Sequence, residues 1–180
     1  MPLRRGFKSE ANEIARQVRR DLRLGLAAPL DPWKLADHLG IPVLPLTSMK
    51  TEAEKAVRQL TREDHEAFSA VTVFSGYRRL IILNDAHSHG RQASSLAHEI
   101  AHSLLMHEPE STVDGKGTRE WNAEEEEEAQ WLAGALLISE EAALTIMRSK
   151  LSLAEGAKRY GTSIEIVRGR LNVTGAKKRL

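Results

Sequence analysis

Apolar residues recur at helical spacing along most of the chain. The first such stretch covers residues 8–24, where three apolar positions stand four residues apart among basic side chains: Ile14, Val18 and Leu22. This pattern predicts an amphipathic helix. Asp31 and Pro32 then provide an N-cap and a first-turn proline for a second helix that ends at Gly40.

Two neighbouring stretches have the composition of strands. Residues 67–74 and 79–84 are rich in β-branched and apolar residues, and they flank the turn sequence Ser75-Gly76-Tyr77-Arg78. This arrangement predicts a β-hairpin. Residues 41–46 are apolar but include prolines, which favours a short edge strand. We therefore expect an α+β fold in which a small antiparallel sheet packs beside a helix, with further helices on its flanks.

Helical periodicity accounts for much of the remaining chain. Thr51 and Glu54 stand in the register of a capping box, which predicts a third helix reaching Leu60. Asn122 and Ser139 are further candidate N-caps. The later helices are expected over residues 88–107, from Asn122 to Ile138 and from Ser139 to Ser149, with a loop from Glu108 to Glu120.

The last two predicted helices resemble a helix-turn-helix. They cover residues 152–160 and 163–171 and are separated by a turn at Gly161. We expect the chain to divide into a domain over residues 1–150 and a C-terminal helix-turn-helix-like subdomain over residues 151–180.

Composition limits the kinds of site that this chain can form. It contains no cysteine, so any metal must be held by histidine and carboxylate side chains. The formal net charge is +1, with basic residues concentrated near both ends and acidic residues from Glu108 to Glu128. An anionic partner fits this asymmetry, but solvated helix faces produce it more often. No apolar run is long enough for a membrane span or a signal peptide, and we expect a cytoplasmic protein.

The segment from His98 to His102 has the pattern H-E-x-x-H within a predicted helix. Two histidines four residues apart lie on the same face of a helix, so both imidazoles can bind one ion. Glu99, between them, can reach a water bound to that ion and act as a general base. This arrangement predicts a Zn²⁺ site of the metallopeptidase type.

A catalytic zinc ion takes a third protein ligand and leaves one position for water. The apolar face of the acidic helix, projected back to its start, turns Glu125 and Glu126 inward and Glu124, Glu127 and Glu128 outward. An inward carboxylate requires a cation, so Glu125 or Glu126 is the expected third ligand. His107 is an alternative only if the helix of the histidines ends early, since it otherwise points away from His98.

The stretch from Arg91 to Leu105 resembles the active-site helix of the ImmA/IrrE metallopeptidase family. A second family signature, an acidic start followed by small and apolar residues, resembles Glu126 to Ser139. Aligning Ala129, Ala133, Leu136 and Leu137 with this second signature places the family's glutamate ligand at Glu126. The resemblance covers roughly residues 8–150 and implies one Zn²⁺ held by His98, His102 and Glu126.

The resemblance also implies a function. Members of this family are cytoplasmic regulatory proteases that cleave a partner transcription repressor of the helix-turn-helix type, in a stress response or in the induction of a mobile element. The protein would then be a zinc metalloendopeptidase with a protein substrate.

Its expected mechanism begins with proton transfer from water to Glu99 and ends with transfer of that proton to the leaving amine. A second electrophile usually stabilises the oxyanion in such reactions. Tyr77, His107 and Tyr160 are candidates for this role. One strand of the 67–84 hairpin could bind an extended substrate by strand addition.

The C-terminal helices support a rival interpretation, a DNA-binding regulator with a structural or vestigial zinc site. Basic side chains suited to phosphate contacts lie in and after the last helix: Arg168, Arg170, Lys177, Lys178 and Arg179. A structural zinc site, however, needs neither a glutamate beside a ligand nor an open position. We therefore favour packing or substrate docking for these helices. An inactive zinc-binding antagonist that only sequesters a repressor is a third interpretation.

Overall fold

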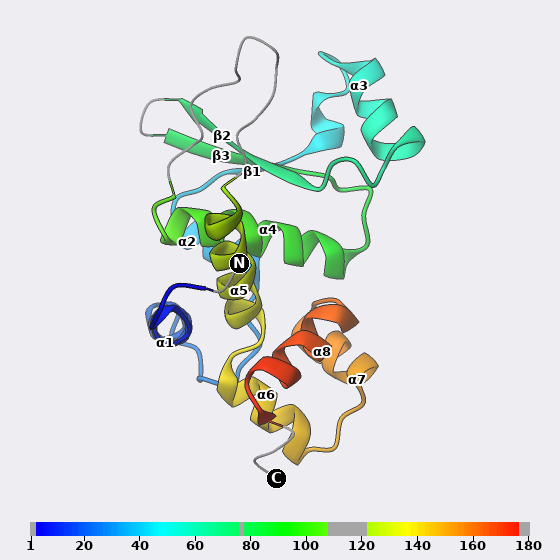
Figure 1. The fold of residues 1–180 in the computed structure, drawn as a ribbon. Helices are drawn as coiled ribbons and strands as arrows, with labels where there is room; N and C mark the ends of the chain where they lie inside the picture. Colours follow the sequence, from blue (N-terminus) through cyan, green and yellow to red (C-terminus); the bar gives the residue numbers. More distant parts are fainter. Residues whose placement is uncertain (1–2, 76–77, 108–121, 177–180) are drawn as a thin grey trace.

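The computed structural model describes residues 3–75, 78–107 and 122–176 of the 180-residue chain. It confirms the predicted α+β fold, with a small sheet beside a long helix and further helices around them (Figure 1). None of the described helices is both long and apolar enough to cross a bilayer. The elements in chain order are α1 (Phe7–Asp21), α2 (Pro32–His38), β1 (Val43–Pro45), the 3-10 turn η1 (Leu46–Met49), α3 (Glu54–Arg58), the π turn η2 (Gln59–Glu63), β2 (Ala70–Ser75), β3 (Arg78–Leu83), α4 (His89–Leu104), α5 (Ala123–Leu137), α6 (Glu140–Arg148), α7 (Leu153–Tyr160) and α8 (Ile164–Val173).

The sheet has the order β1-β3-β2. The predicted hairpin is confirmed: β2 and β3 pair antiparallel, with Ala70 opposite Leu83. Residues 76 and 77 of its turn lie outside the described part of the chain. The short strand predicted within residues 41–46 is also present at a sheet edge, and β1 runs parallel to β3. Because β3 occupies the centre, β2 has no described strand on its outer side.

Most predicted helix starts are confirmed by side-chain caps. Asp31 accepts hydrogen bonds from the backbone of Trp33 and Lys34, while Asn122 and Ser139 cap α5 and α6 in the same way. The predicted capping box at Thr51 is wrong. The N–H groups of Glu52 and Ala53 bond to Met49 O, so this turn delays the start of α3 to Glu54.

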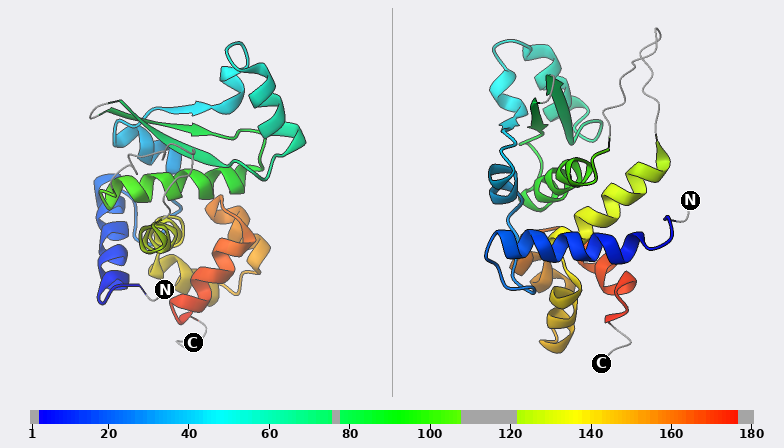
Figure 2. Two further views of the ribbon diagram at one scale, coloured as in Figure 1. Left: turned by 45° about the horizontal axis from the view of Figure 1, so that its top comes forward. Right: turned by 90° about the vertical axis from the view of Figure 1, so that its left-hand side faces the viewer.

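Helix α5 lies at the centre of the helical part of the molecule. Figure 2 shows it end-on, with α4, α1 and α8 around it. In its second half, the residues from Leu132 to Leu137 are all buried. The same apolar cluster includes Tyr160, Val167 and Leu171 of α7 and α8. The division predicted at residue 150 therefore stays a prediction, and the core is continuous across it.

Candidate metal centre

His98 and His102 lie on one face of α4 and point toward the same position. Their Nε2 atoms are 3.1 Å apart. The opposite face of α4 is fully buried, and its core residues are Leu96, Ala97 and Ile100. Burial of this apolar face fixes the rotation of the helix, so the two histidines necessarily face away from the core.

Glu126 completes a group of three ligand atoms. Its carboxylate comes from the first turn of α5, with Oε2 3.1 Å from His98 Nε2 and Oε1 3.4 Å from His102 Nε2. Contact with these two histidines holds the pKa of Glu126 well below its usual value. Among the described residues this is the one cluster of histidine and acidic side chains close enough to bind a metal ion. The structure thus brings together the three ligands expected from the sequence.

The spacing of these atoms fits a zinc ion. Two ligands of a tetrahedral Zn²⁺, each at its usual bond length, stand about 3.3 Å apart. The three observed separations lie close to this value. The donor set of two imidazoles and one carboxylate also matches that of catalytic zinc sites.

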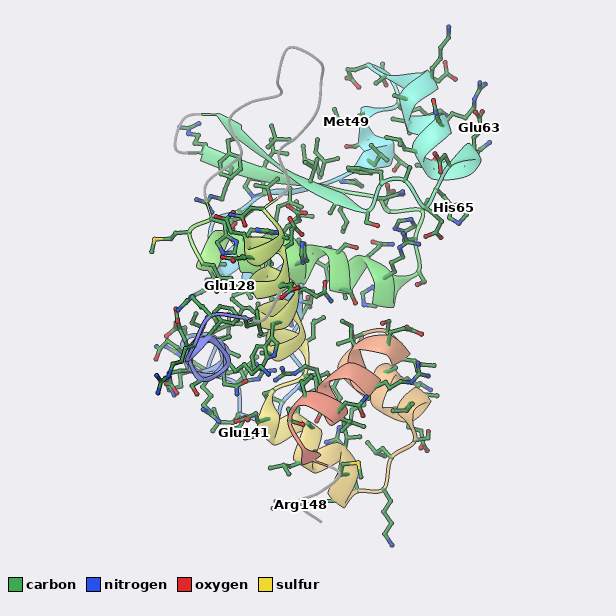
Figure 3. The ribbon with its side chains drawn as sticks, viewed as in Figure 1. Met49, Glu63, His65, Glu128, Glu141 and Arg148 are labelled. Carbon is green, nitrogen blue, oxygen red and sulfur yellow. The ribbon has the colours of Figure 1, made fainter. Side chains whose placement is uncertain are left out.

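The other glutamates of the acidic run have different surroundings. Glu124 and Glu127 are exposed, as predicted. The prediction that Glu128 points outward is wrong, because its side chain is only 13% exposed and its Oε1 lies 2.8 Å from Arg4 Nε. Figure 3 shows Glu128 where α5 passes between α4 and α1. The segment leading into α1 packs over the start of α5 and supplies the positive charge that stabilises this carboxylate.

His107 lies on the side of His102 that is turned away from the three-ligand group. Helix α4 ends at Leu104, and Met106 adopts a left-handed conformation with φ 56°. The chain therefore turns back and places His107 Nδ1 2.9 Å from Nδ1 of His102. His107 is not part of the three-ligand group but contacts the ring nitrogen of His102 that faces away from it. Burial and the neighbouring His102 lower the pKa of His107.

Glu99 has a partner that sequence reasoning missed. The hydroxyl of Thr72, on β2, donates a hydrogen bond of 2.5 Å to Glu99 Oε2. A threonine in a strand is ordinary, so the sequence carries no signal of this role. Glu99 lines the same cleft as His98 and Glu126.

The two described candidates for oxyanion stabilisation are not brought into this cleft. Tyr160 is buried, and its hydroxyl donates to Ala27 O at 3.0 Å. His107 lies on the far side of His102. Tyr77 falls outside the described residues.

Residues 36–172 match the family of IrrE N-terminal-like domains, peptidase family M78. A comparison with curated proteins finds no match. The matched region contains the α4 histidines, Glu99, Thr72 and Glu126 and extends through most of α8. The chain therefore belongs to the M78 peptidase family and contains a metallopeptidase-like IrrE N-terminal domain.

Proposed function

We propose that this protein is a zinc-dependent endopeptidase in which His98, His102 and Glu126 bind the metal. The observation that carries the proposal is the convergence of these three ligand atoms beside the cleft that His98, Glu99 and Glu126 line. The lone pairs of two imidazole nitrogens and a carboxylate at these separations repel one another unless a proton or a cation lies between them. A bound Zn²⁺ removes that conflict and leaves a coordination position for water.

In this proposal Glu99 performs the proton transfers. When bound, zinc lowers the pKa of a coordinated water and polarises the scissile carbonyl. Glu99 accepts one proton from the attacking water as the oxygen–carbon bond forms, and returns it to the leaving amine as the carbon–nitrogen bond breaks. The Thr72 hydroxyl holds Oε2 of Glu99, so that the carboxylate keeps one orientation.

The position of β2, an edge strand of the described sheet, supports binding of an extended peptide. Ala70 of this strand lines the cleft, and Thr72, two residues on, contacts Glu99. Since residues two apart share a face of a strand, this face of β2 is turned toward the site. A substrate segment added along β2 would pass beside Glu99.

The substrate we propose is a helix-turn-helix transcription repressor in the cytoplasm. Support for this comes from membership of the IrrE-like family and the ImmA/IrrE resemblance of the α4 and α5 segments. Cleavage of purified repressors encoded beside this gene, followed by mass spectrometry of the products, tests the substrate class. Intact repressors after incubation with the zinc-loaded protein would contradict it.

The position of Arg170 argues against the rival DNA-binding interpretation. This residue is 4% exposed, donates to Ile138 O and lies over the ring of Trp131 at 4.5 Å. The expectation that it contacts phosphate is therefore wrong, because α8 turns this position into the core. Lys177, Lys178 and Arg179 lie outside the described residues. Glu165 of α8 lines the same cleft as Glu126. These two carboxylates would repel the phosphates of a nucleic acid.

Metal content tests the proposal directly. We expect about one zinc ion per chain in protein purified without chelators or a histidine tag, and a large loss in Glu126→Gln. Glu124→Gln is the matched control, because Glu124 is an exposed residue of the same helical turn. Glu99→Gln should keep zinc and lose peptide cleavage. A wild-type protein that holds no zinc, or a Glu99→Gln variant that still cleaves, would refute the assignment.

A further inference from the structure

The cleft that contains the metal-ligand group extends well beyond it. It has a volume of about 1050 Å³ and is bounded by β2, α4, α5 and α8. Figures 1 and 2 show α8 beside α5 and on the same side of α4. Pockets for single small ligands rarely exceed about 1,000 Å³, so this cleft has room for a peptide segment.

The residues of α5 that line the cleft give the length of this extension. Glu126, Gln130 and Gly134 lie on one face of α5, one above the other. At about 1.5 Å per residue, the cleft follows this helix for about 12 Å from the candidate ligand Glu126. An extended peptide covers that length with roughly three to four residues.

The far wall of the cleft is largely apolar, although Glu165 of α8 also lines the cleft. Ile166, Gly169 and Val173 of α8 recur at helical spacing and line it. Trp131 and Ala133 of α5 line it as well. Val173 is 52% exposed, although it is a large apolar residue. The guanidinium of Arg170, which also lines this region, donates through Nε to Ile138 O and through Nη2 to Asn12 Oδ1 and lies over the ring of Trp131, while its buried Nη1 has no partner among the described residues.

Gly169 leaves open space in this wall, and the packing of the fold does not require a glycine there. A Cβ atom added at Gly169 would meet no atom of the described residues within 4 Å. At the other glycines of the described helices an added Cβ meets a close neighbour: Thr162 at 2.9 Å from Gly90, Arg170 at 3.0 Å from Gly134, and Val167 at 3.2 Å from Gly156. Those three glycines are explained by packing. Gly169 weakens a helix without permitting any close contact within the described chain.

We propose that the α8 wall (Ile166, Gly169 and Val173) is a specificity pocket for a large apolar side chain of the substrate. The side chain belongs to a residue within about four positions of the scissile bond, and Gly169 provides the room for it. The occupant is the cleaved peptide itself, because the wall and the group His98, Glu99 and Glu126 line one continuous cleft. This inference rests on the proposed peptidase function and assigns the C-terminal helices a part in substrate selection.

The test uses the full-length, zinc-loaded protein and pools of quenched fluorescent peptides, each pool with one residue fixed at one position. We expect wild type to prefer Leu, Met or Phe at one position near the cleaved bond. Gly169→Phe should lower kcat/KM for those pools by about tenfold or more and spare pools with Ala there. Arg168→Phe, which adds the same ring on an exposed position of α8, should leave the profile unchanged.

Two outcomes overturn the inference and are distinguishable. If zinc-loaded wild type cleaves no pool, the proposed peptidase function fails and the pocket fails with it. If wild type cleaves but Gly169→Phe has the wild-type profile, or Arg168→Phe changes it equally, the pocket assignment alone is wrong. Melting curves for both variants establish that each is folded.

Discussion

Nδ1 of His107 lies 2.9 Å from Nδ1 of His102. For Nε2 of His102 to bind zinc, the proton of that ring must be on Nδ1, which then donates to His107. His107 Nε2 lies 3.7 Å from Glu128 Oε2, so its own proton is turned toward a carboxylate. By contrast, Nδ1 of His98 is buried with no hydrogen-bond partner among the described residues. The contact therefore orients one of the two histidine ligands.

Replacing His107 by Ala should weaken zinc binding by about 10–100-fold, because His102 loses the acceptor that fixes its tautomer. His107→Gln keeps an acceptor oxygen and should lose less. Competition with a chromophoric chelator of known affinity measures both. His38→Gln, a change at an exposed histidine, serves as control. Equal zinc affinity in His107→Ala and His38→Gln would show that the contact has no role in metal binding.

Thr72→Val removes the hydroxyl that holds Glu99 while keeping a branched side chain suited to β2. We expect zinc content to be unchanged and kcat to fall about tenfold or more, with a smaller change in KM. Thr72→Ser restores the donor and should recover most of the rate. The measurement is steady-state cleavage of a quenched peptide. A Thr72→Val variant that cleaves at the wild-type rate would show that this hydrogen bond has no role in catalysis.

Alanine at two glycines should have opposite effects on stability. Gly169→Ala adds a Cβ in open space and should raise the free energy of unfolding by about 0.5–1 kcal/mol. Gly134→Ala places its Cβ 3.0 Å from Cδ of Arg170, whose guanidinium is anchored at Ile138 O, and should lower it by about 1–3 kcal/mol. Urea unfolding in excess zinc compares the two. Stabilisation by both changes would show that Arg170 moves freely.

We expect no binding to a short DNA duplex at low ionic strength. The buried Arg170 and the acidic residues of the cleft leave α8 with few groups for phosphate contacts. Fluorescence anisotropy of a labelled duplex is the measurement. Binding that weakens steeply with added salt would instead favour the DNA-binding interpretation.

Much of the local structure could be predicted from the sequence, because it depends on interactions between residues close in the chain. Caps at Asp31, Asn122 and Ser139 act within three residues, and the hairpin follows from its strand composition. The shared direction of His98 and His102 is also local, since four residues are about one helical turn. Helical periodicity alone left Glu125 and Glu126 as alternative ligands, and only the family resemblance selected Glu126.

Contacts between distant segments depended on the tertiary structure. The packing of α5 against α4 places Glu126, and not Glu125, against both histidines. The left-handed turn at Met106 brings His107 behind His102, where helical geometry predicted the opposite direction. Thr72, Glu128 and Arg170 likewise have partners that no spacing in the sequence indicates. Periodicity assigns a side chain to a face of its own helix or strand, but its partner is decided by how whole elements pack to bury their apolar faces.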